Sequence, residues 1–185
     1  MELQANAALI IIDQQKGILH PRLGRRNNPD AEARILDLLG IWRSTGRPVI
    51  HVQHLSRSPE SVFWPEQSGV EFQARFMPQD GEWLIQKQVP DAFCGTGLEA
   101  RLREARIAQV IIVGVATNNS VESTTRTAGN LGFEAWVAED ACFTFDKADY
   151  FGTPRSAQEV HAMSLGNLDG EYATVVSSGR ILAIA

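Results

Sequence analysis

The sequence is poor in cysteine and has no long apolar run. Two of its 185 residues are cysteines, Cys94 and Cys142. Two cysteines cannot build a disulfide framework, so a reducing cytoplasm is the expected compartment. No apolar run approaches the roughly 20 residues that cross a bilayer, and the first residues lack the basic and apolar regions of a signal peptide. We therefore expect a cytoplasmic protein that does not associate with a membrane.

Positive charge is also scarce. The chain has 17 lysine and arginine residues against 22 aspartate and glutamate residues, a formal net charge of −5, which argues against nucleic acid as a partner. One basic cluster, Arg22, Arg25 and Arg26, runs against this balance, and we interpret it as a solvated loop. With no repeat, linker or low-complexity tract, the chain is expected to form a single domain over residues 1–185.

Strand-like and helix-like segments alternate along the chain. Residues 8–12 are a continuous apolar run, which is typical of a strand covered on both faces. Further strands are predicted at residues 49–53, 83–86, 110–115, 134–138 and 173–176. Helices are predicted between about Pro29 and Gly46, and at residues 98–105, 119–131 and 157–168.

Capping signals mark the starts of several predicted helices. Asn28 precedes Pro29, the pattern of a cap followed by proline at the first helical position. Ser156 with Glu159 has the spacing of a capping box. The helix that Asn28 opens carries the apolar residues Ala33, Leu36, Leu39, Ile41 and Trp42.

Regular alternation of strands and helices implies parallel strands joined by right-handed crossovers. The predicted architecture is a three-layer, doubly wound, Rossmann-like α/β fold: a parallel six-stranded sheet with helices on both faces. Such sheets bind ligands beyond the carboxyl ends of their strands. The site candidates are therefore the residues that end or follow strands: Asp13, His54, Lys87 and residues 116–120. Two long connections, roughly 55–82 and 140–155, are expected to form lids or partner surfaces.

Ser120 lies at a corner where the strand at 110–115 turns into a helix predicted to begin at about Ser120. Asn119 with Glu122 has capping-box spacing at this corner. A side chain placed there lies near unpaired backbone N–H groups and the positive end of the helix dipole. The corner is therefore a candidate position for a nucleophile.

The ordered set of motifs resembles the isochorismatase-like cysteine hydrolases, a family that includes nicotinamidases and N-carbamoylsarcosine amidohydrolases. The resemblance covers nearly the whole chain. The matching segments are Ile10-Ile11-Ile12-Asp13-Gln14-Gln15, then Lys87 followed by Asp91-Ala92-Phe93, then Gly114-Val115-Ala116-Thr117-Asn118 followed by Val121-Glu122-Ser123-Thr124, and Glu139-Asp140-Ala141.

The resemblance implies a catalytic triad of Asp13, Lys87 and the residue at position 120. In the family, a cysteine thiolate attacks an amide or related carbonyl, the aspartate moves the proton, and water hydrolyses the acyl-enzyme. By position, the backbone N–H groups of Ala116 and Ser120 would hold the oxyanion. The family's non-proline cis peptide would fall at Val115–Ala116.

This chain has Ser120 where the family has its cysteine. A hydroxyl is a far weaker acid than a thiol, so Ser120 would need a general base, and Asp13 could serve only if burial raises its pKa. Three interpretations stay open. Ser120 is a working nucleophile, or the site has lost acyl transfer and binds a ligand or uses its pocket otherwise, or a natural cysteine was replaced by mutagenesis.

Two functions follow from these interpretations. The first is a hydrolase for a small amide, carbamoyl or vinyl-ether compound. Some isochorismatases lack the cysteine and cleave a vinyl ether by acid–base chemistry around the aspartate, so loss of the thiol need not end activity. The second is a catalytically inactive small-molecule-binding or interaction protein on the same fold. The resemblance also implies a homodimer or homotetramer.

Several further residues are assigned to substrate binding or to packing. The predicted substrate-binding residues are Gln15, His54, Phe63, Trp64 and Asn119. The aromatics Phe143 and Phe145 are candidates for a pocket wall, and His161 is expected on a helix face rather than in the site.

His51 and His54 are three apart on an extended segment and so point to opposite faces. We therefore expect no metal site and no cofactor.

Overall fold

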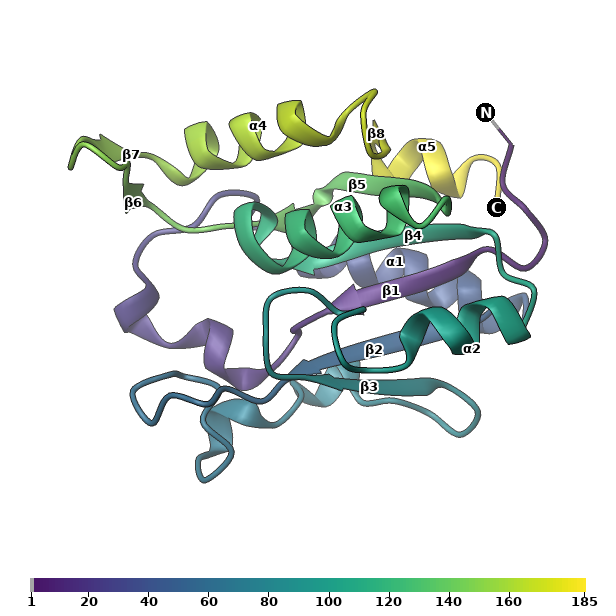
Figure 1. Ribbon diagram of the computed structural model, residues 1–185, viewed down its shortest axis with the longest axis horizontal. Helices are drawn as coiled ribbons and strands as arrows, with labels where there is room; N and C mark the ends of the chain where they lie inside the picture. Colours follow the sequence, from purple (N-terminus) through teal and green to yellow (C-terminus); the bar gives the residue numbers. More distant parts are fainter. Residues whose placement is uncertain (1) are drawn as a thin grey trace.

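A continuous apolar strand, β1 (Ala8–Ile12), lies in the middle of the main sheet. The computed structural model describes residues 2–185, and this sheet has the order β3-β2-β1-β4-β5-β8 with every pairing parallel (Figure 1). The predicted α/β fold with a six-stranded parallel sheet is confirmed. The other strands are β2 (Val49–His54), β3 (Trp83–Lys87), β4 (Gln109–Val115), β5 (Glu134–Phe143) and β8 (Thr174–Val176).

Helices cover both faces of the sheet, which is why β1 is apolar at every position. Ile10 and Ile12 point into one core with α2, α3 and α4, whereas Leu9 and Ile11 point into the other with α1 and α5. In Figure 1, α2 and α3 lie in front of the sheet and α1 lies behind it. The helices are α1 (Ala31–Ser44), α2 (Leu98–Glu104), α3 (Glu122–Asn130), α4 (Ala157–Leu168) and α5 (Ser178–Leu182).

Shorter elements lie in the connections. A small antiparallel hairpin, β6 (Lys147–Ala148) with β7 (Pro154–Arg155), projects away from the main sheet (Figure 1). The 3₁₀ turns are η1 (Lys16–Leu19), η2 (Pro21–Leu23), η3 (Ser68–Val70) and η4 (Ala74–Phe76), and a π-helical turn, η5 (Thr117–Val121), precedes α3. Within residues 2–185, no helix is both long and apolar enough to cross a membrane.

The predicted cap at Asn28 is wrong. Helix α1 begins at Ala31, and Asn28 instead has a positive φ of 43° and donates its amide to the carbonyl oxygens of Glu139 (3.0 Å) and Cys142 (2.7 Å). The Asn28 side chain therefore bonds to the distant strand β5 and does not cap the helix as the local sequence predicts. The apolar residues of α1 that are buried are Ala31, Ile35, Leu38, Leu39 and Trp42, whereas Ala33 is exposed.

The capping box predicted at Asn119 and Glu122 does not form, whereas the box at Ser156 and Glu159 does. The π-helical turn η5 separates β4 from α3, so Ser120 lies inside this wide turn rather than at the first residue of the helix. Glu122 bonds Arg126 and Ser164, 2.7 and 2.6 Å away, instead of capping the turn.

Strand β5 is longer than predicted: it continues beyond residue 138 to Phe143 and so includes the first residues of the connection expected at roughly 140–155. Its pairing with β4 shifts register between Ile112 and Gly114. Gly114 has a φ of 121°, and a Cβ built there would lie 2.2 Å from the Ile12 carbonyl oxygen. Glycine therefore permits the irregularity that extends β5. Asp140, inside this strand, accepts hydrogen bonds from the backbone and hydroxyl of Ser178 at the start of α5.

Candidate active site

The residues expected to form the site meet at the carboxyl edge of the sheet. Asp13 directly follows β1, Lys87 is the last residue of β3, and Ser120 lies in the turn after β4. Strand order reverses between β1 and β4, and ligands of doubly wound sheets bind at this switch point. The buried Lys87 side chain reaches from β3 to this point, so the three side chains converge.

The Lys87 ammonium is the centre of the cluster. Its Nζ donates to Asp13 Oδ2 at 2.9 Å and to Ser120 Oγ at 3.0 Å. The third close contact of Nζ is His54 Nδ1, 3.4 Å away. The Lys87 side chain is 0% exposed and that of Asp13 is 3% exposed, so this ion pair is shielded from water.

Burial changes the acid–base character of Asp13. It raises the pKa of the Asp13 carboxyl above its ordinary value, although the charge of Lys87 and its hydrogen bond act in the opposite direction. Within the described residues, Asp13 Oδ1 has no hydrogen-bond partner. Asp13 also has a φ of 52°, a left-handed conformation that is uncommon for residues other than glycine and is often found at functional sites. This carboxyl can therefore exchange a proton nearer neutral pH than an exposed aspartate can.

The turn that carries Ser120 is closed by hydrogen bonds between its own backbone groups. The peptide bond Val115–Ala116 is cis, as the family resemblance implied, and the Ala116 carbonyl accepts from Asn119 N and Val121 N. Ser120 is 5% exposed. The two hydrogen bonds to the Ala116 carbonyl close the turn that carries the buried Ser120 hydroxyl.

Helix α4 supports this turn through His161 and Ser164. His161 Nδ1 lies 2.8 Å from Thr117 Oγ1, and Ser164 Oγ donates to the Thr117 carbonyl at 3.0 Å. Burial lowers the pKa of His161, so the ring is neutral. His161 lies on the face of α4 that packs behind the turn, and it does not line the cavity that contains Asp13 and Ser120.

A cavity of about 520 Å³ opens above Asp13 and Ser120. At its mouth, the exposed Arg22 donates to the Glu60 carbonyl. The predicted binding residues His54, Phe63 and Asn119 all line it. Arg22 and Gln88 also line it: Arg22 was assigned to a solvated basic cluster, and Gln88 has no local signal beyond polarity. The lining consists of Asp13, Arg22, Leu23, His54, Glu60, Ser61, Val62, Phe63, Gln88, Pro90, Asn119 and Ser120.

Two predicted substrate-binding residues do not line this cavity. Gln15 is buried and its amide is used elsewhere: Nε2 donates to the carbonyls of His54 (2.9 Å) and Val70 (2.8 Å), while Oε1 accepts from His54 N (2.8 Å). Trp64 is half-buried beside the lining residue Phe63 but does not reach the cavity. The second long connection, 140–155, contributes nothing to the lining, so Phe143 and Phe145 are not part of this wall.

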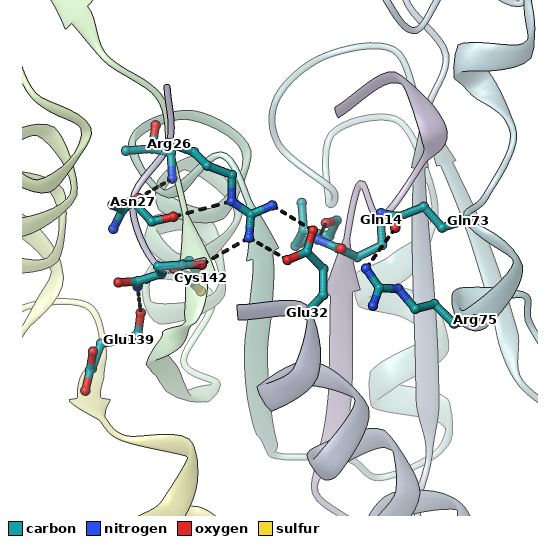
Figure 2. A network of polar contacts seen from close by, with 11 residues as sticks. Gln14, Arg26, Asn27, Glu32, Gln73, Arg75, Glu139 and Cys142 are labelled. Carbon is teal, nitrogen blue, oxygen red and sulfur yellow. Dashed lines mark hydrogen bonds and ion pairs between the residues drawn. The ribbon is translucent and has the colours of Figure 1, made fainter. Parts of the chain in front are cut away.

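A polar network fixes the segment that follows η2. Figure 2 shows the Arg26 guanidinium directed at the Glu32 carboxylate, and the Nη1–Oε1 distance is 2.7 Å. Arg26 also lies 3.6 Å above the ring of Phe143. Although burial opposes it, Arg26 holds the pKa of Glu32 below its ordinary value. The prediction that Arg26 is simply solvated is therefore wrong, because it joins α1 to the end of β5.

His51, Cys94 and Cys142 do not line the cavity. His51 Nε2 contacts Glu82 Oε2 at 2.8 Å, on the opposite side of β2 from His54, as the alternation predicts. Across residues 2–185, no group of three or more His, Cys, Asp or Glu is arranged to hold a metal ion. Cys94 is exposed and Cys142 is buried, and neither lines the cavity.

The chain is similar to known proteins in both sequence and structure. The model of the isochorismatase domain matches residues 7–179. The isochorismatase family protein YrdC of Bacillus subtilis (strain 168) is 37% identical over 97% of this chain and 96% of its own. A streptothricin hydrolase of Streptomyces noursei is 33% identical over 75% of this chain and 50% of its own. A crystal structure described as belonging to the isochorismatase family, from Chromobacterium violaceum ATCC 12472, has a TM-score of 0.96 and 49% identity, and the match covers 100% of this chain and 96% of that one.

Proposed function

The chain belongs to the isochorismatase family, and from that premise we propose that it hydrolyses a small amide, carbamoyl or vinyl-ether compound in the cavity above Ser120. The observation that carries the proposal is the position of Lys87 Nζ, 2.9 Å from Asp13 Oδ2 and 3.0 Å from Ser120 Oγ. One buried cation thus contacts both a proton-transfer group and a nucleophile-position oxygen. The name of the streptothricin hydrolase relative supports a hydrolytic reaction class.

On an amide or carbamoyl substrate, Ser120 acts in the place of the family's cysteine. Asp13 accepts the hydroxyl proton while Oγ attacks the carbonyl carbon, and Lys87 stabilises the charge that develops on Oγ. The backbone N–H groups of Ala116 and Ser120 hold the oxyanion. Asp13 then returns the proton to the leaving nitrogen. In the second half, Asp13 takes a proton from water, hydroxide attacks the acyl carbon, and Oγ leaves with that proton.

On a vinyl ether, the same carboxyl acts first as an acid. Protonated Asp13 gives its proton to the terminal alkene carbon, which leaves an oxocarbenium ion. Water adds to that ion and returns a proton to Asp13, and the resulting hemiketal divides into a ketone and an alcohol. This route needs no covalent bond to Ser120. The pKa of Asp13, raised by burial, supports both routes, since the group must change protonation state during each.

The test is a turnover screen of the purified protein against simple amides, activated esters, N-carbamoyl compounds and isochorismate. We expect Asp13→Ala to lose about 10²-fold to 10⁴-fold on every substrate that is turned over. Loss in Ser120→Ala as well identifies the acyl-transfer route, and retention there identifies the vinyl-ether route. Ser120→Cys should raise amidase turnover if the rest of the triad is competent. Glu66→Ala, an exposed carboxylate outside the cavity, is the matched control.

Two outcomes contradict the proposal. Turnover that survives in Asp13→Ala would place the chemistry elsewhere. No turnover on any class, together with a metabolite retained through purification and released by denaturation, would favour a binding protein on the same fold.

A further inference from the structure

The environment of Lys87 determines which nitrogen of His54 carries the proton. An ammonium group has three N–H donors and no acceptor, so a ring nitrogen that faces it must offer a lone pair. Lys87 Nζ is 3.4 Å from His54 Nδ1, and its other two close contacts are the oxygens of Asp13 and Ser120. His54 Nδ1 is therefore the acceptor of the third N–H, and in a neutral ring the proton sits on Nε2.

The His54 ring is neutral at physiological pH. Burial and the neighbouring Lys87 charge lower its pKa to about 4. The other titratable groups that share the cavity are Asp13, Arg22 and Glu60. Arg22 and Glu60 have opposite charges and lie at the mouth, while Asp13 is paired with Lys87. Within the described residues, none of these three groups forms a hydrogen bond or ion pair with the ring.

Three contacts fix the position of the ring. The Gln15 side chain makes two hydrogen bonds with the His54 backbone, of 2.8 and 2.9 Å. Phe63 meets the ring edge-to-face with centroids 5.6 Å apart, and Lys87 holds Nδ1. His54 lines the same cavity as Asp13 and Ser120, and within the described residues its Nε2 has no hydrogen-bond partner. Because this donor is already held in one place beside the reacting groups, little conformational entropy is lost at His54 when a substrate binds.

We propose that His54 is a specificity-determining residue whose Nε2–H donates to an uncharged acceptor oxygen of the substrate, next to the bond that is hydrolysed. The charges of Lys87 and Asp13 cancel at the cavity floor and the imidazole is neutral. The floor therefore favours a neutral carbonyl or ether oxygen over a carboxylate or phosphate. The substrate class named here rests on the proposed function, whereas the tautomer of His54 does not.

The tautomer is measured by NMR on the full-length protein labelled with ¹⁵N-histidine, with His54 assigned from the His54→Gln variant. We expect one neutral form of His54, protonated on Nε2, that persists down to about pH 5. In Lys87→Met, both tautomers should be populated and the ring should titrate nearer its ordinary pKa. A wild-type ring protonated on Nδ1, or titrating near the ordinary value, overturns the inference, and this reading does not require the variant to fold.

The donor is then tested with acetamide, a neutral amide, added up to its solubility limit. We expect the His54 Nε2 resonance to move, while exposed His20 and buried His51 in the same spectrum report non-specific effects. His54→Gln keeps an N–H donor near Nε2 and should bind acetamide about as well as wild type, and His54→Leu should bind about tenfold more weakly. An unmoved Nε2 resonance, or equal acetamide affinity in His54→Leu, overturns the inference.

These readouts do not depend on turnover, so the two proposals fail separately. A protein that hydrolyses nothing but shows both NMR results keeps the donor and loses the proposed function. A protein that turns over substrate with His54 protonated on Nδ1 keeps the function and loses the donor.

Discussion

Lys87 and Asp13 form an ion pair of 2.9 Å in which neither side chain is more than 3% exposed. Charges removed from water in this way depend on each other, because neither has solvent to replace its partner. The pair therefore links the stability of the protein to the chemistry of its cavity.

Replacing Lys87 with methionine should destabilise the fold by about 3–5 kcal/mol, since the change leaves a buried carboxyl without its cation. Urea unfolding at neutral pH measures the loss. Lys16→Met is the matched control, because Lys16 pairs with Glu71 where both side chains are about half exposed, and that pair should contribute little. Equal losses in the two variants would show that the buried pair has no special role.

The pH profile of turnover should distinguish the two chemical routes. Burial raises the pKa of Asp13, so the carboxylate form appears only as the pH rises through that raised value. Ester or amide hydrolysis, which needs the carboxylate, should increase across this range, and vinyl-ether cleavage, which needs the acid, should decrease. In Lys87→Met, the pH at which ester or amide turnover rises should move upward, because the cation that lowers the pKa of Asp13 is gone. If the rise in turnover with pH occurs at the same pH in this variant as in the wild type, Asp13 is not the group whose titration causes it.

Glu82 should contribute to stability above about pH 4.5. Although burial opposes it, hydrogen bonds from Arg43, Gln79 N and His51 lower its pKa from 4.5 to about 2. A carboxyl whose pKa is lower in the folded state stabilises the fold above its unfolded pKa, and the contribution is lost as the pH falls towards 2.

The variant Glu82→Gln should therefore lose about 2 kcal/mol at pH 7 and much less near pH 3. Denaturant unfolding across this range measures the difference, with Glu66→Gln on the surface as the control. A loss that is independent of pH would mean that packing, not charge, is responsible.

Gly114→Ala should be strongly destabilising, by more than about 3 kcal/mol, because its Cβ would meet the Ile12 backbone in a left-handed conformation. Gly166→Ala in α4 is the opposite case, since nothing lies within 4 Å of its added Cβ. That variant should gain about 0.5–1 kcal/mol from lower chain entropy. The midpoint temperatures of thermal unfolding of the two variants measure these effects. Similar changes in the two midpoints would contradict the close approach of the chain at Gly114.

The central strands could be predicted from the sequence because each residue of β1 meets an apolar neighbour on one face or the other. The positions of Asp13, Lys87 and Ser120 follow from the same pattern, since strand ends converge in a parallel sheet. The cap at Asn28 and the capping box at Asn119 and Glu122 were mispredicted because a side chain of each motif bonds another segment, as Glu122 does in accepting from Ser164. A local hydrogen bond competes with contacts to distant segments, as when Asn28 donates to Glu139 and Cys142.

The contacts of Gln15 with the His54 backbone and of the His54 ring with Lys87 could not be predicted from sequence spacing. They depend on the register that sets His54 opposite Lys87 between β2 and β3. They also depend on the path of the long connection that brings Val70 and Phe63 back to the end of β2. Such a path is decided by the packing of the whole segment, for which a single sequence has no periodic signal.

The support of the Ser120 turn by α4 bears on the order in which the site is completed during synthesis. Thr117 is anchored by His161 and Ser164, which follow it by 44 and 47 residues. A nascent chain that has emerged as far as β5 already contains Asp13, Lys87 and Ser120, but its turn lacks these anchors. The chain is synthesised from its N-terminus on the ribosome. The turn that carries Ser120 therefore gains its contacts with His161 and Ser164 only after α4 has left the exit tunnel and packed against it.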